Sequence, residues 1–151
     1  MEGVLVVVHL LAAAVWVGGS TALIFAGVPA IRTIAPAERG PAMRELGLRW
    51  RPLGYGALLV AALTGIALAA HDWETRPAAF QIVLWVKVAL AVCLVVVSYV
   101  HNFVLGPRLQ AEIREGRPER SRRALVVVGW TSYALTLAVP LLGVVLQQLV
   151  A

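Results

Sequence analysis

The feature that most constrains this fold is a set of apolar runs that are too long for the strands of a soluble protein. One of them, GALLVAALTGIALAA at 56–70, contains no charged residue. A helix that crosses a bilayer needs about 20 mostly apolar residues. Four segments come close to or exceed this length, at 4–30, 53–70, 80–105 and 125–149.

The composition agrees, since 60% of the residues are hydrophobic and only 14% are charged. We therefore predict an all-α integral membrane protein, in which residues 1–151 form a single four-helix transmembrane domain with up-down topology. The first segment follows no Lys or Arg, exceeds a signal-peptide core and precedes no obvious cleavage site, so we expect it to be retained. The single cysteine, Cys93, excludes an intramolecular disulfide and a CxxC site. No internal repeat is evident.

The basic residues predict the orientation, because short loops rich in Lys and Arg stay in the cytoplasm. The connections after the first and third segments are rich in arginine, whereas the 71–79 loop has only Arg76. The basic residues are Arg32, Arg39, Arg44, Arg49 and Arg51 in the first connection, and Arg108, Arg114, Arg117, Arg120, Arg122 and Arg123 in the third. Four crossings then place both termini and the 71–79 loop outside, on the periplasmic side of a bacterial-type inner membrane. These basic connections account for the net charge of +5, so we do not expect the protein to bind nucleic acid.

Residues spaced three, four or seven apart share one face of a helix. On this basis each segment concentrates its small and polar residues on one face, which we expect to lie inward. The four faces contain His9, Ala12, Ala13, Trp16, Gly19 and Ser20; Ala57, Ala61, Thr64, Leu68 and His71; Lys87, Ala91, Leu94, Ser98, His101 and Asn102; and Gly129, Ser132, Tyr133, Thr136, Pro140, Gly143 and Gln147. Trp50, Tyr55 and Trp73 are predicted at the headgroup level.

Ionisable residues inside apolar helices indicate function, because a charged lysine near the bilayer centre costs about 3 kcal/mol. Counting from the outer ends places His9, His71 and Lys87 within about 10 Å of one level. His101 and Asn102 form a separate group near the inner end of the third helix. The third connection is expected to continue that helix until Gly116 and Pro118 interrupt it.

These residues occur in segments that resemble a known family. HLLAAAVWVGG with the following Pro29 and Arg32, LWVKVALAVCLVVVSYVHNFVLGPRL, and RRALVVVGWTSYALTLAVPLLGVVL resemble the CopD (copper resistance protein D) domain. This resemblance implies a small membrane protein that handles copper. The domain is also similar to the HemJ family, which has a histidine on its first helix and a lysine on its third, matching His9 and Lys87. The residues after Gly19 lack the aromatic-rich run of that family.

Three functions follow as hypotheses. The first is an inner-membrane copper-handling protein that takes copper from a periplasmic donor inward, without catalytic residues; its metal ligands would be His9, His71, Asp72 and Glu74, with His101 as a further candidate. The second, implied by the HemJ resemblance, is a haem b- or porphyrin-binding membrane oxidoreductase whose cofactor contacts His9, Lys87 and Trp16. The third is a non-catalytic subunit whose polar face binds a partner helix. Soft copper ligands are few, since Met1, Met43 and Cys93 are the only sulfur-bearing residues.

Overall fold

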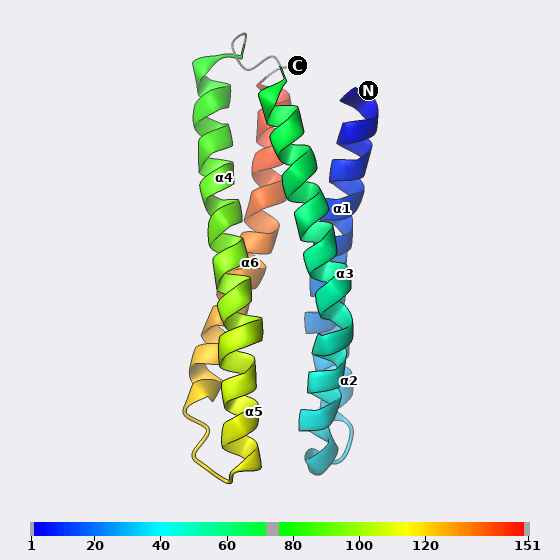
Figure 1. Cartoon of the computed structure of the whole chain (residues 1–151), viewed down its shortest axis with the longest axis vertical. Helices are drawn as coiled ribbons and strands as arrows, with labels where there is room; N and C mark the ends of the chain where they lie inside the picture. The colour runs from blue at the N-terminus through cyan, green and yellow to red at the C-terminus, as the bar shows by residue number, and fades with distance from the viewer. Residues whose placement is uncertain (1, 72–75, 150–151) are drawn as a thin grey trace. The chain divides into compact units, whose positions relative to one another are not determined.

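The regular structure of the described residues is entirely helical, which confirms the prediction of an all-α fold (Figure 1). The computed structural model describes residues 2–71 and 76–149. Four helical stretches are long and apolar enough to cross a membrane, as in a multi-pass membrane protein: Gly3–Arg32, Pro36–Ala70, Ala78–Arg114 and Ser121–Gln148. The chain divides into two compact units, Met1–Arg76 and Pro77–Ala151.

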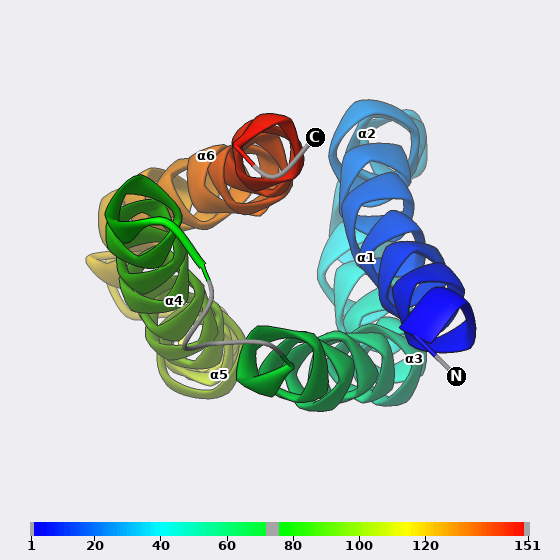
Figure 2. The same cartoon turned by 90° about the horizontal axis from the view of Figure 1, so that it is seen from above.

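The first unit is a helical hairpin. Helix α1 (Glu2–Ala22) continues through the π-helical segment η1 (Leu23–Gly27) into α2 (Val28–Arg32). A short turn leads into α3 (Pro36–Ala70), which packs along α1, and the helix ends where the backbone at His71 becomes extended (Figures 1 and 2). The hairpin is therefore held together mainly by the contact of α1 with α3.

The second helical stretch begins at Pro36 and not at residue 53, as predicted from hydropathy. Its first part is polar but regular, with Arg49 Nε donating to Glu45 Oε1 at 2.7 Å across one helical turn. Hydropathy detects only the apolar part of a helix, whereas the backbone hydrogen bonds continue into its polar part. The first connection is consequently a turn of a few residues.

The second unit is also a helical hairpin. Helix α4 (Ala78–Tyr99) continues through the π-helical segment η3 (Val100–Leu105) into α5 (Gly106–Arg114), and α6 (Ser121–Gln148) packs against α4. The expected extension of this stretch and its interruption near Gly116 are confirmed, because α5 ends at Arg114 and Gly116 has a φ of 63°. Glu112 accepts hydrogen bonds from the Ser121 backbone N–H at 3.0 Å and hydroxyl at 2.9 Å, which fixes the start of α6.

The two units share one order of elements, which was not expected from the sequence. Each has a long helix, a π-helical segment, a short helix and a returning helix. Adding 78 to a residue number in the first unit gives its counterpart in the second, without a gap. Pairs that keep their residue type under this relation include Ser20 and Ser98, Phe25 and Phe103, Pro29 and Pro107, Tyr55 and Tyr133, and Gly65 and Gly143. About half of the other pairs exchange one apolar residue for another, and the rest change in character, so the sequence alone does not reveal the repeat.

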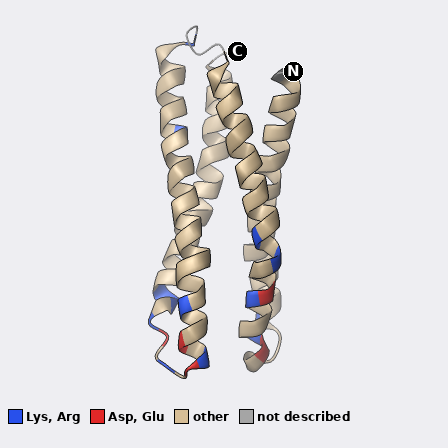
Figure 3. Ribbon diagram, in the orientation of Figure 1, with Lys and Arg blue, Asp and Glu red and all other residues tan. Residues whose placement is uncertain are grey.

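The predicted inward faces are the less exposed faces of the helices within each unit. Ala12 and Trp16 are buried in the first unit, and Leu94, Ser98, Thr136 and Leu146 are buried in the second. Of the residues predicted to face inward, His71 and Gln147, near helix ends, are exposed. Many valines and leucines occupy the opposite, exposed faces. In each unit most of the described charged residues gather at the end where its two helical stretches are joined (Figure 3).

Candidate functional site

His9 is half-buried on α1 and contacts α3 through its imidazole. Its Nδ1 atom lies 2.9 Å from the carbonyl oxygen of Ala61 and 3.1 Å from Thr64 Oγ1. A carbonyl oxygen can only accept, so Nδ1 carries the proton in this hydrogen bond. The Thr64 hydroxyl donates to the Val60 carbonyl at 2.7 Å, which leaves its oxygen to accept from the ring. In the neutral imidazole these contacts assign the lone pair to Nε2.

A glycine on α3 makes room for this ring. A Cβ atom at Gly65 would lie 3.1 Å from His9 Cε1 and 3.5 Å from Nδ1, closer than most side-chain contacts allow. Gly65 therefore lets the imidazole lie close to the backbone of α3, in contact with its carbonyl and hydroxyl groups. The sequence placed Thr64 on the inward face but did not identify Gly65 as the residue beneath the ring.

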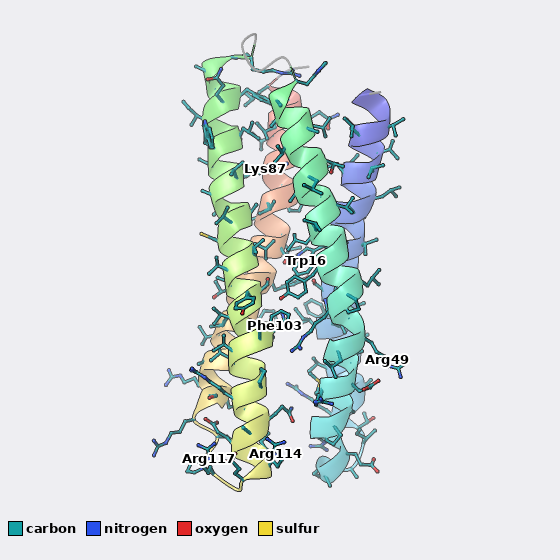
Figure 4. All side chains as sticks on the ribbon, in the orientation of Figure 1. Trp16, Arg49, Lys87, Phe103, Arg114 and Arg117 are labelled. Atoms are coloured by element: carbon teal, nitrogen blue, oxygen red, sulfur yellow. The ribbon has the colours of Figure 1, made fainter. Side chains whose placement is uncertain are left out.

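Trp16, the third predicted cofactor residue, lies at the centre of an aromatic cluster in the same unit (Figure 4). It is 6% exposed, and its ring centroid lies 6.2 Å from that of Trp50 and 5.9 Å from that of Tyr55. The Trp50 ring occupies the space above Gly19 and Gly54, where a Cβ at either position would collide with it. Trp50 and Tyr55 thus pack inside the hairpin, and their predicted depth at the headgroup level stays a prediction. Trp73 lies outside the described residues.

Of the remaining proposed metal ligands in the first unit, the structure describes only His71, which does not lie beside His9. His71 is exposed and lies further along α3, about 9 Å from Gly65 by the rise of a helix. Asp72 and Glu74 lie outside the described residues. Among residues 2–71 and 76–149, no group of three His, Cys, Asp or Glu side chains is arranged to hold a metal ion.

Lys87 occupies in the second unit the position that His9 occupies in the first. It is half-buried on α4, and a Cβ at Gly143 of α6 would lie 3.3 Å from its Nζ atom. Gly143 is in turn the counterpart of Gly65. Each unit therefore places one ionisable side chain of its first helix over one glycine of its returning helix.

His101 and Asn102 belong to a buried polar cluster at the π-helical segment η3. Ser98 Oγ and Ser132 Oγ lie 2.8 Å apart, joining α4 to α6, and Asn102 Nδ2 donates to the Ser98 carbonyl at 2.9 Å. A Cβ at Gly129 would lie 3.0 Å from His101 Nε2. The predicted association of His101 with Asn102 thus forms part of the contact between the two helices of this unit.

Comparisons with protein-family models, with curated proteins and with solved structures found no match to this chain.

Proposed function

We propose that this chain is a multi-pass membrane protein that binds copper through Nε2 of His9 and passes it across the membrane. The observation that carries the proposal is the hydrogen bond from His9 Nδ1 to the Ala61 carbonyl. Metal-binding histidines commonly donate their second ring N–H to a carbonyl or carboxylate, which fixes the tautomer and orients the ligand nitrogen. Imidazole is a suitable ligand for copper.

The surroundings of His9 support a role beyond packing. A polar side chain in an apolar helix needs a hydrogen-bond partner, and Ala61 and Thr64 provide two acceptors for a single N–H group. The resemblance of HLLAAAVWVGG and the HNFVLGPRL ending to the CopD domain supports copper as the metal.

The proposed path begins on the side of the 71–79 loop. His71, with Asp72 and Glu74, would collect copper there from a periplasmic donor and deliver it to His9; His101 would be a later contact. The arginine-rich ends of both hairpins support this orientation, with the two basic connections in the cytoplasm and both termini in the periplasm of a bacterial-type cell. The four helices would form an up-down bundle in the inner membrane.

Haem b is the second candidate, because a haem iron also takes an axial histidine through one ring nitrogen. The geometry of His9 fits such a ligand: Nδ1 is held by Ala61 and Thr64, and Gly65 leaves room beside the ring. Haem would supply one-electron redox chemistry to a HemJ-like oxidoreductase. In this chain His9 would hold the iron, while Trp16 and Lys87 would contact the porphyrin and its carboxylates.

The experiment is to purify the full chain in an uncharged detergent and to measure its copper content and visible spectrum. The copper proposal predicts a colourless protein after incubation with Cu(I), with about one copper per chain that is lost in His9→Ala. Thr64→Val is the graded variant, because it removes one of the two Nδ1 partners and should weaken copper binding about tenfold.

Other results would contradict the copper proposal. A Soret band that disappears in His9→Ala would favour haem. Protein that binds neither copper nor haem would favour the third hypothesis, a non-catalytic subunit whose polar helix face binds a partner.

A further inference from the structure

The repeat relation draws attention to Lys87, the only lysine in the chain. Lys87 is the counterpart of His9 in the second unit, and Gly143 is the counterpart of Gly65. The contact of His9 with Gly65 is therefore repeated by Lys87 and Gly143, with an amine in place of the imidazole. The same framework that presents an imidazole in the first unit thus presents an amine in the second. An imidazole suits metals, whereas an ammonium group with three donors suits oxygen anions.

Among residues 77–149, the part of the second unit that the structure describes, no acidic side chain lies near Lys87. The glutamates of this unit are Glu112, Glu115 and Glu119, all in or after α5. Glu115 pairs with Arg117 at 2.7 Å and Glu119 with Arg122 at 3.1 Å, while Glu112 binds Ser121. Glu112 follows Lys87 along one helical stretch at a distance of about 37 Å by the helix rise.

The depth of Lys87 makes an uncompensated charge costly. Lys87 lies about 13 Å along the helix axis from Ala78, where α4 begins, inside a stretch apolar enough to cross a membrane. The neighbouring side chains Trp85, Val86 and Val88 are exposed apolar groups. An ion in such surroundings is typically paired or lines a pathway.

We propose that Lys87, over Gly143, is a second ligand site that binds the carboxylate or phosphate group of a membrane-dissolved molecule. The ligand would carry a hydrocarbon part against the exposed apolar face of α4 and an anionic group against Nζ. Gly143 lets the amine lie close to α6, as Gly65 does for His9. This site does not require metal at His9, so it stands apart from the proposed copper function.

The test uses the single lysine as a probe. Full-length protein labelled with 13C at lysine Cε, in maltoside detergent, should give one lysine signal. Dodecanoate or dodecyl phosphate should shift this signal in a saturable way, and dodecanol should not. A response to only one of the two anions would identify the chemical class of the ligand. No shift with either anion, or an equal shift with dodecanol, would overturn the proposal.

Glycine variants provide the matched control. Gly143→Ala adds a methyl group 3.3 Å from the present position of Nζ and so displaces the amine. It should weaken anion binding about tenfold, the loss of roughly one charge-assisted hydrogen bond. Gly65→Ala makes the equivalent change beside His9 and should leave anion binding unchanged while lowering copper content. Equal effects of the two variants on anion binding would contradict the assignment to Lys87. Copper content measured on the same samples separates this result from that of the proposed copper function.

Discussion

At the scale of single residues, glycines determine where the large and the ionisable side chains lie. His9, Lys87 and His101 each lie against a glycine of the returning helix of their own unit, namely Gly65, Gly143 and Gly129. In membranes, small residues let helix backbones approach closely, and here they also make room for polar rings and an amine. The glycines are therefore part of the candidate sites, although they carry no functional group.

Two adjacent glycines on α1 give a direct test of this packing. A methyl group at Gly19 would collide with the Trp50 ring, whereas a methyl group at Gly18 would meet nothing within 4 Å. We expect Gly19→Ala to lower the stability by about 1–3 kcal/mol through overpacking. Gly18→Ala should leave it unchanged or slightly higher, because alanine favours a helix more than glycine.

The measurement is thermal unfolding of both variants in the same detergent, followed by circular dichroism. Trp50→Leu should relieve the effect of Gly19→Ala in the double variant. Equal stabilities of Gly18→Ala and Gly19→Ala would show that Trp50 does not fill this space.

At the scale of the helices, the two hairpins are held by different chemistry at corresponding places. In the first, Trp50 lies over Gly19 and Gly54. In the second, the counterpart of Gly54 is Ser132, which meets Ser98 at 2.8 Å. One hairpin thus joins its helices with an aromatic ring and the other with a pair of hydroxyl groups.

The hydroxyl pair predicts a measurable coupling between α4 and α6. A double-mutant cycle of Ser98→Ala and Ser132→Ala should give a coupling of about 0.6–2 kcal/mol, the range for such bonds between membrane helices. Thr131 is the control, because its hydroxyl donates to the Val127 carbonyl of its own helix at 3.0 Å. A cycle of Ser98→Ala with Thr131→Val should show no coupling, and a similar value in both cycles would contradict the assignment.

The helices and their inward faces could be predicted from the sequence, because apolar length and the helical period are local properties. Ser98, Thr136 and Trp16 were all placed on the correct faces. The start of α3 at Pro36 was missed, since its first residues are polar and their helical pairing is invisible to hydropathy. The packing of Trp50 and the glycines beneath His9 and Lys87 were not predicted. Each depends on which residues of the two helices in a hairpin lie opposite one another, and the pattern of one helix alone does not contain this information.

At the scale of the whole molecule, the distribution of charge carries the expected orientation. In each hairpin the arginines are concentrated where its two helical stretches are joined (Figures 3 and 4). In the first hairpin the helical stretches are joined by a short turn near residue 34. In the second hairpin they are joined by the loop around residue 117. Arginines close to a short connection favour its retention in the cytoplasm, so we expect both of these connections to lie there.

Cysteine labelling tests this orientation. In a Cys93→Ser background, Glu38→Cys and Glu119→Cys should resist a membrane-impermeant maleimide in intact cells, and His71→Cys should react. Lysed cells supply the control, in which all three cysteines should react. Labelling of Glu38→Cys but not of His71→Cys in intact cells would reverse the orientation and with it the proposed inward direction of copper.

The central claim is that Nε2 of His9 is the metal ligand, with Nδ1 bound to Ala61 and Thr64. Pulsed electron paramagnetic resonance of the protein loaded with one equivalent of Cu(II) detects the remote nitrogen of a coordinated imidazole. The account predicts such a signal in the full chain, its loss in His9→Ala and a changed nitrogen coupling in Thr64→Val. A remote-nitrogen signal that persists unchanged in His9→Ala would contradict it.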